Sequence, residues 1–232
     1  MKVDKLSVFF PVYNEEKNIS VTVEKAVAVL KKLPLKEYEI ILVDDGSKDS
    51  TPQVVDELAR TYKFTRAVHQ ENGGYGMALR TGFSNAKYDW IVYTDADGQF
   101  DFSQVTKLLD KIESADVVYG YRIKRNDNLV RIVAGWGWKM TTKVLFGVPV
   151  KDVDCGFKIV NKKVLDKISP LQSTRGGMIN AELVVKARKA GFKIDQVGVD
   201  HFPRMSGRST GVNFKVIVQS YLDLFKLWYK IR

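Results

Sequence analysis

Several features that define other protein classes are missing from this chain of 232 residues. A single cysteine excludes a disulfide framework and favours a reduced, cytoplasmic setting. No apolar run approaches the roughly 20 residues of a transmembrane helix, and the charges that follow Met1 do not resemble a secretory signal. Internal repeats, low-complexity tracts and linkers are also absent. The sequence therefore predicts one large domain that buries its own core.

Acidic residues are comparatively scarce. There are 27 of them against 37 lysines and arginines, so the formal net charge is +10. Such an excess predicts an anionic partner, which is nucleic acid, a phosphorylated ligand or an anionic membrane surface. Nucleic acid is disfavoured because no nucleic-acid-binding motif accompanies the charge.

Short apolar runs alternate with amphipathic stretches along the chain. The apolar runs are nearly continuous, as in strands buried on both faces, and the amphipathic stretches have helical spacing. The predicted strands are 6–10, 39–43, 65–70, 90–93, 116–120 and 193–199. The predicted helices are 16–32, 52–62, a stretch ending at Ala86, 102–114, 180–190 and 212–232. This alternation predicts an α/β fold with a mostly parallel sheet and helices on both faces.

Polar or glycine-rich clusters follow four successive strands, and parallel sheets bind ligands beyond such strand ends. The most informative cluster follows the strand 90–93 and contains Asp95, Asp97 and Gln99. Alternation along an extended chain places the two carboxylates on one side, and oxygen ligands of this kind suit Mg²⁺ or Mn²⁺. A solvated strand-to-loop turn explains the same residues, so both interpretations stay open at this point.

An ordered set of motifs runs through almost the whole chain. They are Pro-Val-Tyr-Asn-Glu at 11–15, Val-Asp-Asp-Gly-Ser-Lys-Asp-Ser-Thr at 43–51, Asn-Gly-Gly-Tyr-Gly-Met-Ala at 72–78, Asp-Ala-Asp-Gly-Gln at 95–99, Gly-Tyr-Arg at 120–122, Asp152 with Gly-Phe-Lys at 156–158, Glu182, and Arg204 with Gly207 and Ser209. In this order they resemble the family-two glycosyltransferases of GT-A fold, and within that family the dolichyl- or polyprenyl-phosphate sugar synthases.

The resemblance implies roles for particular residues. It implies a nucleotide-sugar site formed by Pro11, Tyr13, Glu15, Val43, Asp44, Asp45 and Asp95. It implies a site for Mg²⁺ or Mn²⁺ at Asp95, Asp97 and Gln99. It implies catalytic roles for Asp97, Arg122, Glu182 and Arg204, and contacts to an acceptor phosphate from Arg122, Arg131, Arg204 and Ser209. Without the resemblance, the residues around Asp45 are better explained as a turn, and Tyr13 as a core residue.

This chain departs from the family pattern in two places. Many relatives carry a histidine after the glutamine of the aspartate motif, where this chain has Phe100. Relatives often carry a lysine after the serine that Ser209 matches, where this chain has Thr210, and Arg208 supplies a nearby cation instead.

Two segments bear on the acceptor. The segment 122–146 combines basic residues with Trp136 and Trp138. One interpretation is a lipid-phosphate site near a membrane. The other is a helix that packs on the sheet with its tryptophans in the core. We separate a domain at 1–211 from an amphipathic helix at 212–232. That helix either lies in the membrane interface or packs on the domain or on a second copy of the chain.

The resemblance therefore implies a metal-dependent, inverting glycosyltransferase. It would move a sugar from a nucleoside-diphosphate sugar to a polyprenyl phosphate, as a peripheral protein at the cytoplasmic face of a membrane. One alternative is a glycosyltransferase with a soluble or glycan acceptor. The other is a non-catalytic, membrane-associated protein that binds nucleotide sugars.

Overall fold

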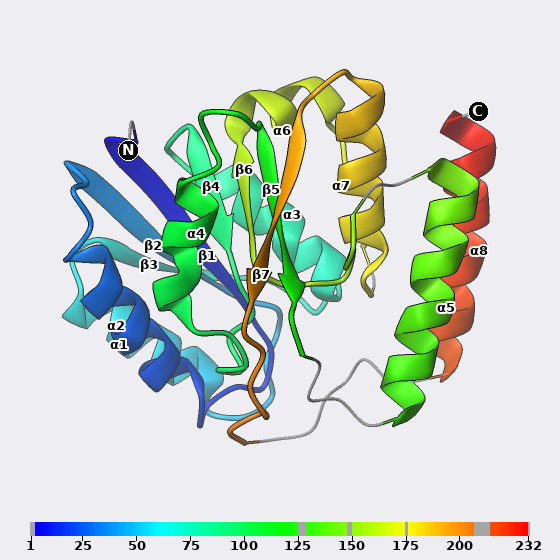
Figure 1. The fold of residues 1–232 in the computed structure, drawn as a ribbon. Helices are drawn as coiled ribbons and strands as arrows, with labels where there is room; N and C mark the ends of the chain where they lie inside the picture. Colours follow the sequence, from blue (N-terminus) through cyan, green and yellow to red (C-terminus); the bar gives the residue numbers. More distant parts are fainter. Residues whose placement is uncertain (1–2, 125–128, 148–149, 175, 207–213, 232) are drawn as a thin grey trace.

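The computed structural model describes residues 3–124, 129–147, 150–174, 176–206 and 214–231, and of residues 129–134, 214–220 and 230–231 only the backbone (Figure 1). Its strands are β1 (Lys5–Val12), β2 (Glu37–Asp44), β3 (Thr65–His69), β4 (Trp90–Tyr93), β5 (Val117–Arg122), β6 (Lys158–Asn161) and β7 (Ile194–Val199). They form one sheet in the order β3-β2-β1-β4-β6-β5-β7.

All neighbouring strands are parallel except those that pair with β6. The predicted, mostly parallel sheet is confirmed. The sequence did not predict β6 or the helix that follows it, α6 (Lys162–Ile168), because a strand of four residues gives little periodicity. Strand β6 runs between β4 and β5, so it brings the 152–157 turn to the same edge of the sheet as the end of β4.

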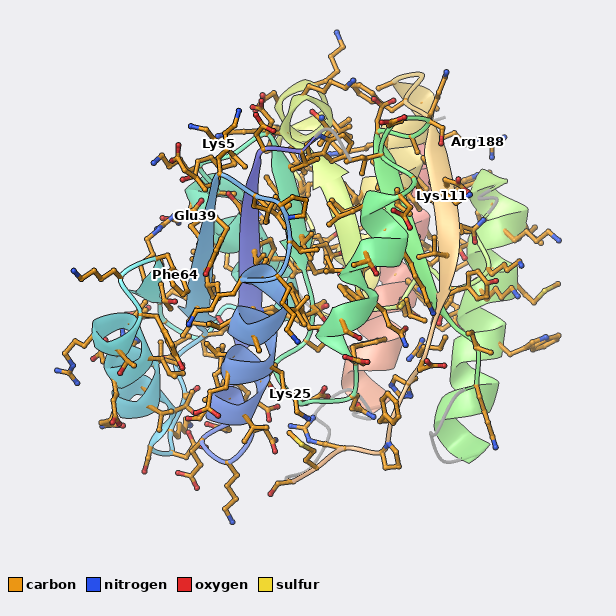
Figure 2. All side chains as sticks on the ribbon, turned by 60° about the vertical axis from the view of Figure 1, so that its left-hand side comes forward. Lys5, Lys25, Glu39, Phe64, Lys111 and Arg188 are labelled. Carbon is orange, nitrogen blue, oxygen red and sulfur yellow. The ribbon has the colours of Figure 1, made fainter. Side chains whose placement is uncertain are left out.

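Two layers of helices cover the sheet. The helices are α1 (Ile19–Leu30), α2 (Thr51–Thr61), α3 (Tyr75–Asn85), η1 (Phe102–Gln104), α4 (Val105–Leu109), α5 (Leu129–Phe146), α6, α7 (Met178–Lys189) and α8 (Phe214–Ile231). One buried cluster joins the sheet to α3, α6 and α7, and the other joins it to α1, α2 and α4. Figure 2 shows the side chains that crowd both faces of the sheet.

The helix predicted at 102–114 is shorter than expected. A 3-10 turn, η1, leads into α4, which ends at Leu109. Beyond it, beside single i to i+4 bonds from Asp110 and Ala115, backbone bonds of the i to i+3 kind appear, with Lys111 donating to Leu108 and Ser114 to Lys111. Such bonds tighten the chain into turns and end the α-helix, although Leu108, Leu109 and Ile112 keep the buried spacing of a helix.

Helices α5 and α8 lie side by side at one edge of the molecule, next to α7 (Figure 1). Leu224 and Leu227 of α8 are buried, and Tyr221 meets Trp138 of α5 edge to face at 5.3 Å between ring centroids. The inner side of α8 therefore packs on the domain, which is one of the two interpretations of the tail. Within the described residues, no helix is long and apolar enough to cross a membrane.

Candidate active site

The candidate active site lies where β1 and β4, which are neighbours in the sheet, both end. Glu15 follows β1, and Asp95 and Asp97 follow β4. The order of strands reverses here, since β1 lies between β2 and β4, and open α/β sheets bind their ligands at such a point. The fold thus brings Glu15 to the two aspartates, from which it is far apart in the sequence.

Arg204 bridges two of these carboxylates. Its Nη1 lies 3.1 Å from Oδ2 of Asp97, and its Nη2 donates to Oε1 of Glu15. Burial raises the pKa of Glu15, and the hydrogen bond from Asn18 and the charge of Arg204 oppose that rise. A cation at this position is what lets the acidic groups lie close together.

The loop that carries Arg204 follows β7 and closes over the end of β4. The backbone N–H of Phe202 donates to the Gln99 carbonyl over 2.8 Å, and Nε2 of Gln99 donates to the Phe202 carbonyl over 3.1 Å. Met205 lies against Gly98, where a Cβ would stand 2.4 Å from the Met205 methyl carbon, and the φ of 74° at Gly98 also favours glycine. The loop that carries Arg204 therefore contacts the aspartate motif directly.

Asp95 is half-buried beside the other carboxylates. Its Oδ1 accepts a hydrogen bond from the Tyr75 hydroxyl at 3.0 Å. Burial raises the pKa of Asp95, while the Tyr75 hydrogen bond and the charges of Lys158 and Arg122 oppose the rise. The missing side chain of Gly156 makes room for this carboxylate, because a Cβ there would lie 2.1 Å from Oδ2 of Asp95.

The residues expected to hold a divalent cation are Asp95, Asp97 and Gln99. In the described part of the chain, no three His, Cys, Asp or Glu side chains converge as a metal site. A pair of carboxylates nevertheless fits Mg²⁺, which usually keeps several waters and binds through one or two carboxylates plus substrate phosphates. The guanidinium on Asp97 supports this fit, since it shows that the position accepts positive charge. Gln99 would offer its amide oxygen.

The residues expected to bind the nucleotide lie at the ends of β1 and β2. Pro11 and Val43 are register partners and are buried, and Tyr13 is half-buried. Asp44 accepts from the Ser47 N–H at 3.1 Å and contacts Nδ1 of His69 at 2.9 Å. These contacts organise the start of the 45–51 segment, and binding of a nucleotide here stays a prediction.

Asp45 has a different set of partners from the predicted base or ribose. Its carboxylate accepts from the N–H groups of Gly73 and Gly74 at 2.8 and 2.9 Å and from Nε2 of Gln70 at 2.6 Å. Gly74 has a φ of 87°, which glycine tolerates best, and it begins α3. Asp45 therefore holds the glycine-rich loop at the N-terminus of α3, beside Tyr75.

Arg122 forms the second arginine site of this edge. Its Nε and Nη2 donate to the two oxygens of Asp152 at 2.6 and 2.8 Å, and both side chains are almost fully buried. The pair lines a pocket of about 530 Å³ between the end of β5, the 151–154 segment and α5. The pocket also contains Lys139, Lys151 and Trp138, whose indole N–H is buried without a hydrogen-bond partner among the described residues.

Glu182 is fully buried in α7. Its carboxylate accepts from the N–H groups of Gln172 and Ser173 and pairs with Nζ of Lys186 at 2.7 Å. Burial raises its pKa, but these hydrogen bonds, Lys186 first, bring the pKa below its ordinary value. The loop that contains Gln172 and Ser173 continues to α3, where the Met77 N–H donates to the Thr174 carbonyl. Glu182 therefore positions this loop, and a role as a base stays a prediction.

Two expected acceptor contacts lie outside the described residues. They are Ser209 and the side chain of Arg131. Sequence reasoning also missed three residues that line or support the site, Tyr75, Lys158 and Asn180. The signal for Lys158 was present, since a lysine opens the apolar run 158–160, but nothing in the sequence showed which way it points.

A model of the family described as "Glycosyl transferase family 2" matches residues 7–169. The chain belongs to glycosyl transferase family 2. This family-two chain is 31% identical over 222 residues to dolichyl-phosphate beta-glucosyltransferase of Saccharomyces cerevisiae, covering 84% of the chain and 66% of the relative. It is 28% identical over 209 residues to glycosyltransferase AglD of Haloferax volcanii, covering 86% of the chain and 33% of the relative. The chain thus spans about a third to two thirds of the length of these curated relatives.

The family-two chain also resembles solved structures. Glucosyl-3-phosphoglycerate synthase from Mycobacterium tuberculosis, in complex with Mn²⁺, uridine diphosphate and glucosyl-3-phosphoglycerate, superposes with a TM-score of 0.71 at 19% identity. The match covers 96% of this chain and 79% of that one, and it shows the shared fold. Membership of the predicted family and the predicted GT-A fold are confirmed.

Proposed function

We propose that this chain transfers a sugar from a nucleoside-diphosphate sugar to a polyprenyl phosphate, with inversion at the sugar and with Mg²⁺ or Mn²⁺. The names of its relatives in Saccharomyces cerevisiae and Trichomonas vaginalis support a dolichyl-phosphate acceptor. The solved synthase that shares the fold was crystallised with Mn²⁺ and uridine diphosphate, which supports a divalent ion and a nucleotide donor. The observation that carries the proposal is the group of carboxylates at the β1–β4 end, held together by an arginine.

The reaction exchanges one bond to the anomeric carbon for another. An oxygen of the acceptor phosphate attacks that carbon, the bond to the donor's diphosphate breaks, and the nucleoside diphosphate leaves with the electron pair. A divalent ion, when bound, supplies Lewis-acid stabilisation of the charge on the leaving group. Because a phosphate acceptor is already ionised near neutral pH, positioning matters more than a general base. Glu182 would then act on the loop at α3 and not on the acceptor's proton.

Arg204 would change partners during the cycle. In the structure, its guanidinium neutralises Asp97 and Glu15. These carboxylates would hold the ion and the donor, and Arg204 would then bind phosphate oxygens, for which its planar fork is well suited. Asp45, Asp44, Tyr13, Pro11 and Val43 line the strand ends where the nucleoside would lie.

The pocket beside Arg122 is our candidate for the acceptor phosphate. It offers Arg122, Lys139 and Lys151 as cations and, as a donor, the indole N–H of Trp138, which has no partner in the described part of the chain. Buried donors without partners are rare and commonly point to a ligand. Arg131 and Ser209 remain predicted contacts of the same phosphate.

Replacement of Trp138 by phenylalanine tests this pocket. The ring is kept and only the N–H is lost, so we expect the acceptor KM to rise by about tenfold while the donor KM stays within about twofold, as for one hydrogen bond to a charged group. The matched control is Trp90→Phe, because Trp90 begins β4, at the end of that strand away from Asp95. An unchanged acceptor KM in Trp138→Phe would remove the pocket from the proposal.

The outer faces of α5 and α8 are our candidate for membrane contact at the cytoplasmic face. They expose large apolar side chains beside lysines, a combination that suits an anionic membrane surface. The apolar ones are Trp136, Met140, Val144, Leu222, Phe225 and Tyr229. We expect the protein to float with anionic vesicles and the double variant Trp136→Ser/Phe225→Ser to float less. Dimerisation of the wild type that the same variant abolishes would instead assign this face to a second copy.

The activity itself is tested with labelled nucleotide sugars, a polyprenyl phosphate and Mn²⁺. We expect one donor to be used and Asp97→Asn to lower kcat by about 1,000-fold or more, because metal stabilisation of a leaving group is worth several kcal/mol. Transfer only to water-soluble acceptors would favour a glycan acceptor. Nucleotide-sugar binding without any turnover would favour a non-catalytic protein.

A further inference from the structure

Lys158 is a fully buried cation that the proposed reaction does not use. It opens β6, where it is the register partner of Tyr93 on β4 and of Tyr119 on β5. Its side chain is 0% exposed, and Nζ lies 5.2 Å and 4.8 Å from the centroids of these two rings. The ammonium group is thus enclosed between two tyrosine faces, which attract cations.

A closed hydrogen-bond network surrounds this ammonium group. Nζ donates to the carbonyl of Cys155 and to Oδ1 of Asn180, the latter at 3.1 Å. The Tyr93 hydroxyl donates to the same Oδ1 at 2.7 Å, and the Tyr119 hydroxyl donates to the Asn180 carbonyl at 3.1 Å. Lys158 therefore ties the sheet to the first turn of α7 and to the turn before β6.

Stability does not explain a lysine at this position. An ammonium group loses its hydration here, and among the described residues it forms no ion pair in return. Replacing a buried charge by a well-packed apolar side chain is often neutral or stabilising. Burial lowers the pKa of Lys158 to about 8, and the groups whose charges oppose this are Cys155, Asp152, Asp154 and Asp95, which belong to the turn or to the site.

The turn that Lys158 holds reaches both halves of the site. Asp152, which grips Arg122, lies three residues before Cys155. Gly156, directly after Cys155, lies against the Asp95 carboxylate. A shift of this turn would move Arg122 and Asp95 relative to each other.

We infer that Lys158 is a positioning residue, which fixes the 152–157 turn through the Cys155 carbonyl and Asn180 and so sets the placement of Arg122 against Asp95. The inference rests on the proposed function only where activity is measured. The residue touches no reacting atom and acts through the turn.

The test compares Lys158→Met, which keeps the length but neither charge nor donor, with Lys158→Gln, which keeps a donor. Lys162→Met is the matched control, because Lys162 also donates to a backbone carbonyl, that of Ala86, away from the site. Hydrogen exchange is the first measurement. In Lys158→Met we expect amides of 152–157 to exchange at least about tenfold faster, with those of β1 and α1 unchanged. Lys158→Gln should fall between Lys158→Met and the wild type.

Kinetics is the second measurement. We expect Lys158→Met to lower kcat by about 10- to 100-fold with the donor KM and the melting temperature nearly unchanged, as for a small misplacement of reacting groups. Wild-type exchange at 152–157 in Lys158→Met would overturn the inference, and so would faster exchange throughout the core with a large fall in melting temperature. A wild-type protein without activity would defeat the proposed function, and the exchange data would still decide on Lys158.

Discussion

The two arginines at the edge of the sheet are held in opposite ways. Arg122 lies at the end of β5 and donates two parallel hydrogen bonds to Asp152, with 7% and 14% of the two side chains exposed. Arg204 leaves a loop, is 20% exposed, and spans two carboxylates that belong to different strand ends. The first pair is built to stay together. Under the proposed function the second set of contacts separates, because Glu15 would face the donor and Asp97 the metal ion.

The site therefore has one rigid side, which contains Arg122, and one exchangeable side, which contains Arg204. Buried pairs are expensive to break because they leave a charge without compensation. Arg204 lies nearer the solvent than Arg122, although its partners Glu15 and Asp97 are as buried as Asp152, so separating its ion pairs costs less. A site that transfers a sugar needs both a rigid side and an exchangeable side. The rigid side holds the acceptor in position, while the counter-charge of the leaving group changes on the exchangeable side.

The largest expected effect is a difference in unfolding free energy between a variant of the rigid side and a variant of the exchangeable side. Asp152→Asn should lower the free energy of unfolding by about 3–5 kcal/mol, because it removes the carboxylate that accepts two hydrogen bonds from the largely buried Arg122 guanidinium. Asp97→Asn should lower it by about 1 kcal/mol or less, since Arg204 keeps Glu15 and is partly exposed. Urea unfolding of both variants measures the difference. Equal losses of unfolding free energy in the two variants would contradict the division into a rigid side and an exchangeable side.

A second prediction concerns pH and the turn on the rigid side. The folded pKa of Lys158, about 8, lies below the ordinary 10.5, so the unfolded chain binds more protons between these values. The free energy of unfolding should therefore rise as the pH increases from about 8 to 10.5, by about 3 kcal/mol for this group. Lys158→Met should lack that rise. If the free energies of unfolding of the wild type and of Lys158→Met changed in parallel across this pH range, the lowered pKa of Lys158 would be contradicted.

The smallest expected effect concerns the exchangeable side. Arg204→Gln removes the cation that competes for Asp97 and Glu15, so Mn²⁺ should bind about tenfold more tightly in the absence of nucleotide, a change of about 1.4 kcal/mol. Titration followed by Mn²⁺ electron paramagnetic resonance measures this affinity. The control Lys107→Gln removes one exposed charge elsewhere. If both variants bind Mn²⁺ equally, Arg204 does not occupy the cation's place.

Much of the framework follows from local patterns. The apolar run 90–93 and the carboxylates after it were recognisable because a buried strand followed by Asp and Gly has a strong signal. The same holds for 39–43, which became the inner part of β2. Strand β6 had no such signal, and its antiparallel direction arises from the chain's return between β4 and β5. The end of α4 was missed because i to i+3 bonds keep nearly the same burial pattern.

Site partners were harder to predict than site positions. Asp45 and Glu182 were expected to face ligands, yet each carboxylate accepts backbone N–H groups from a loop. A carboxylate in the sequence shows only that an acceptor is available. Whether loop N–H groups, a cation or a substrate uses it depends on which segments meet there.

The sequence by itself determined the family, the alternation of strands and helices, and the presence of carboxylates and arginines at the strand ends, because these depend on residue type and short-range spacing. Tertiary structure alone decided that Arg204 crosses to Glu15 and Asp97, that Asp152 takes Arg122, and that Lys158 lies between two tyrosines. Each of these contacts joins segments distant in the sequence, and only the packing of the sheet brings them within reach of one another.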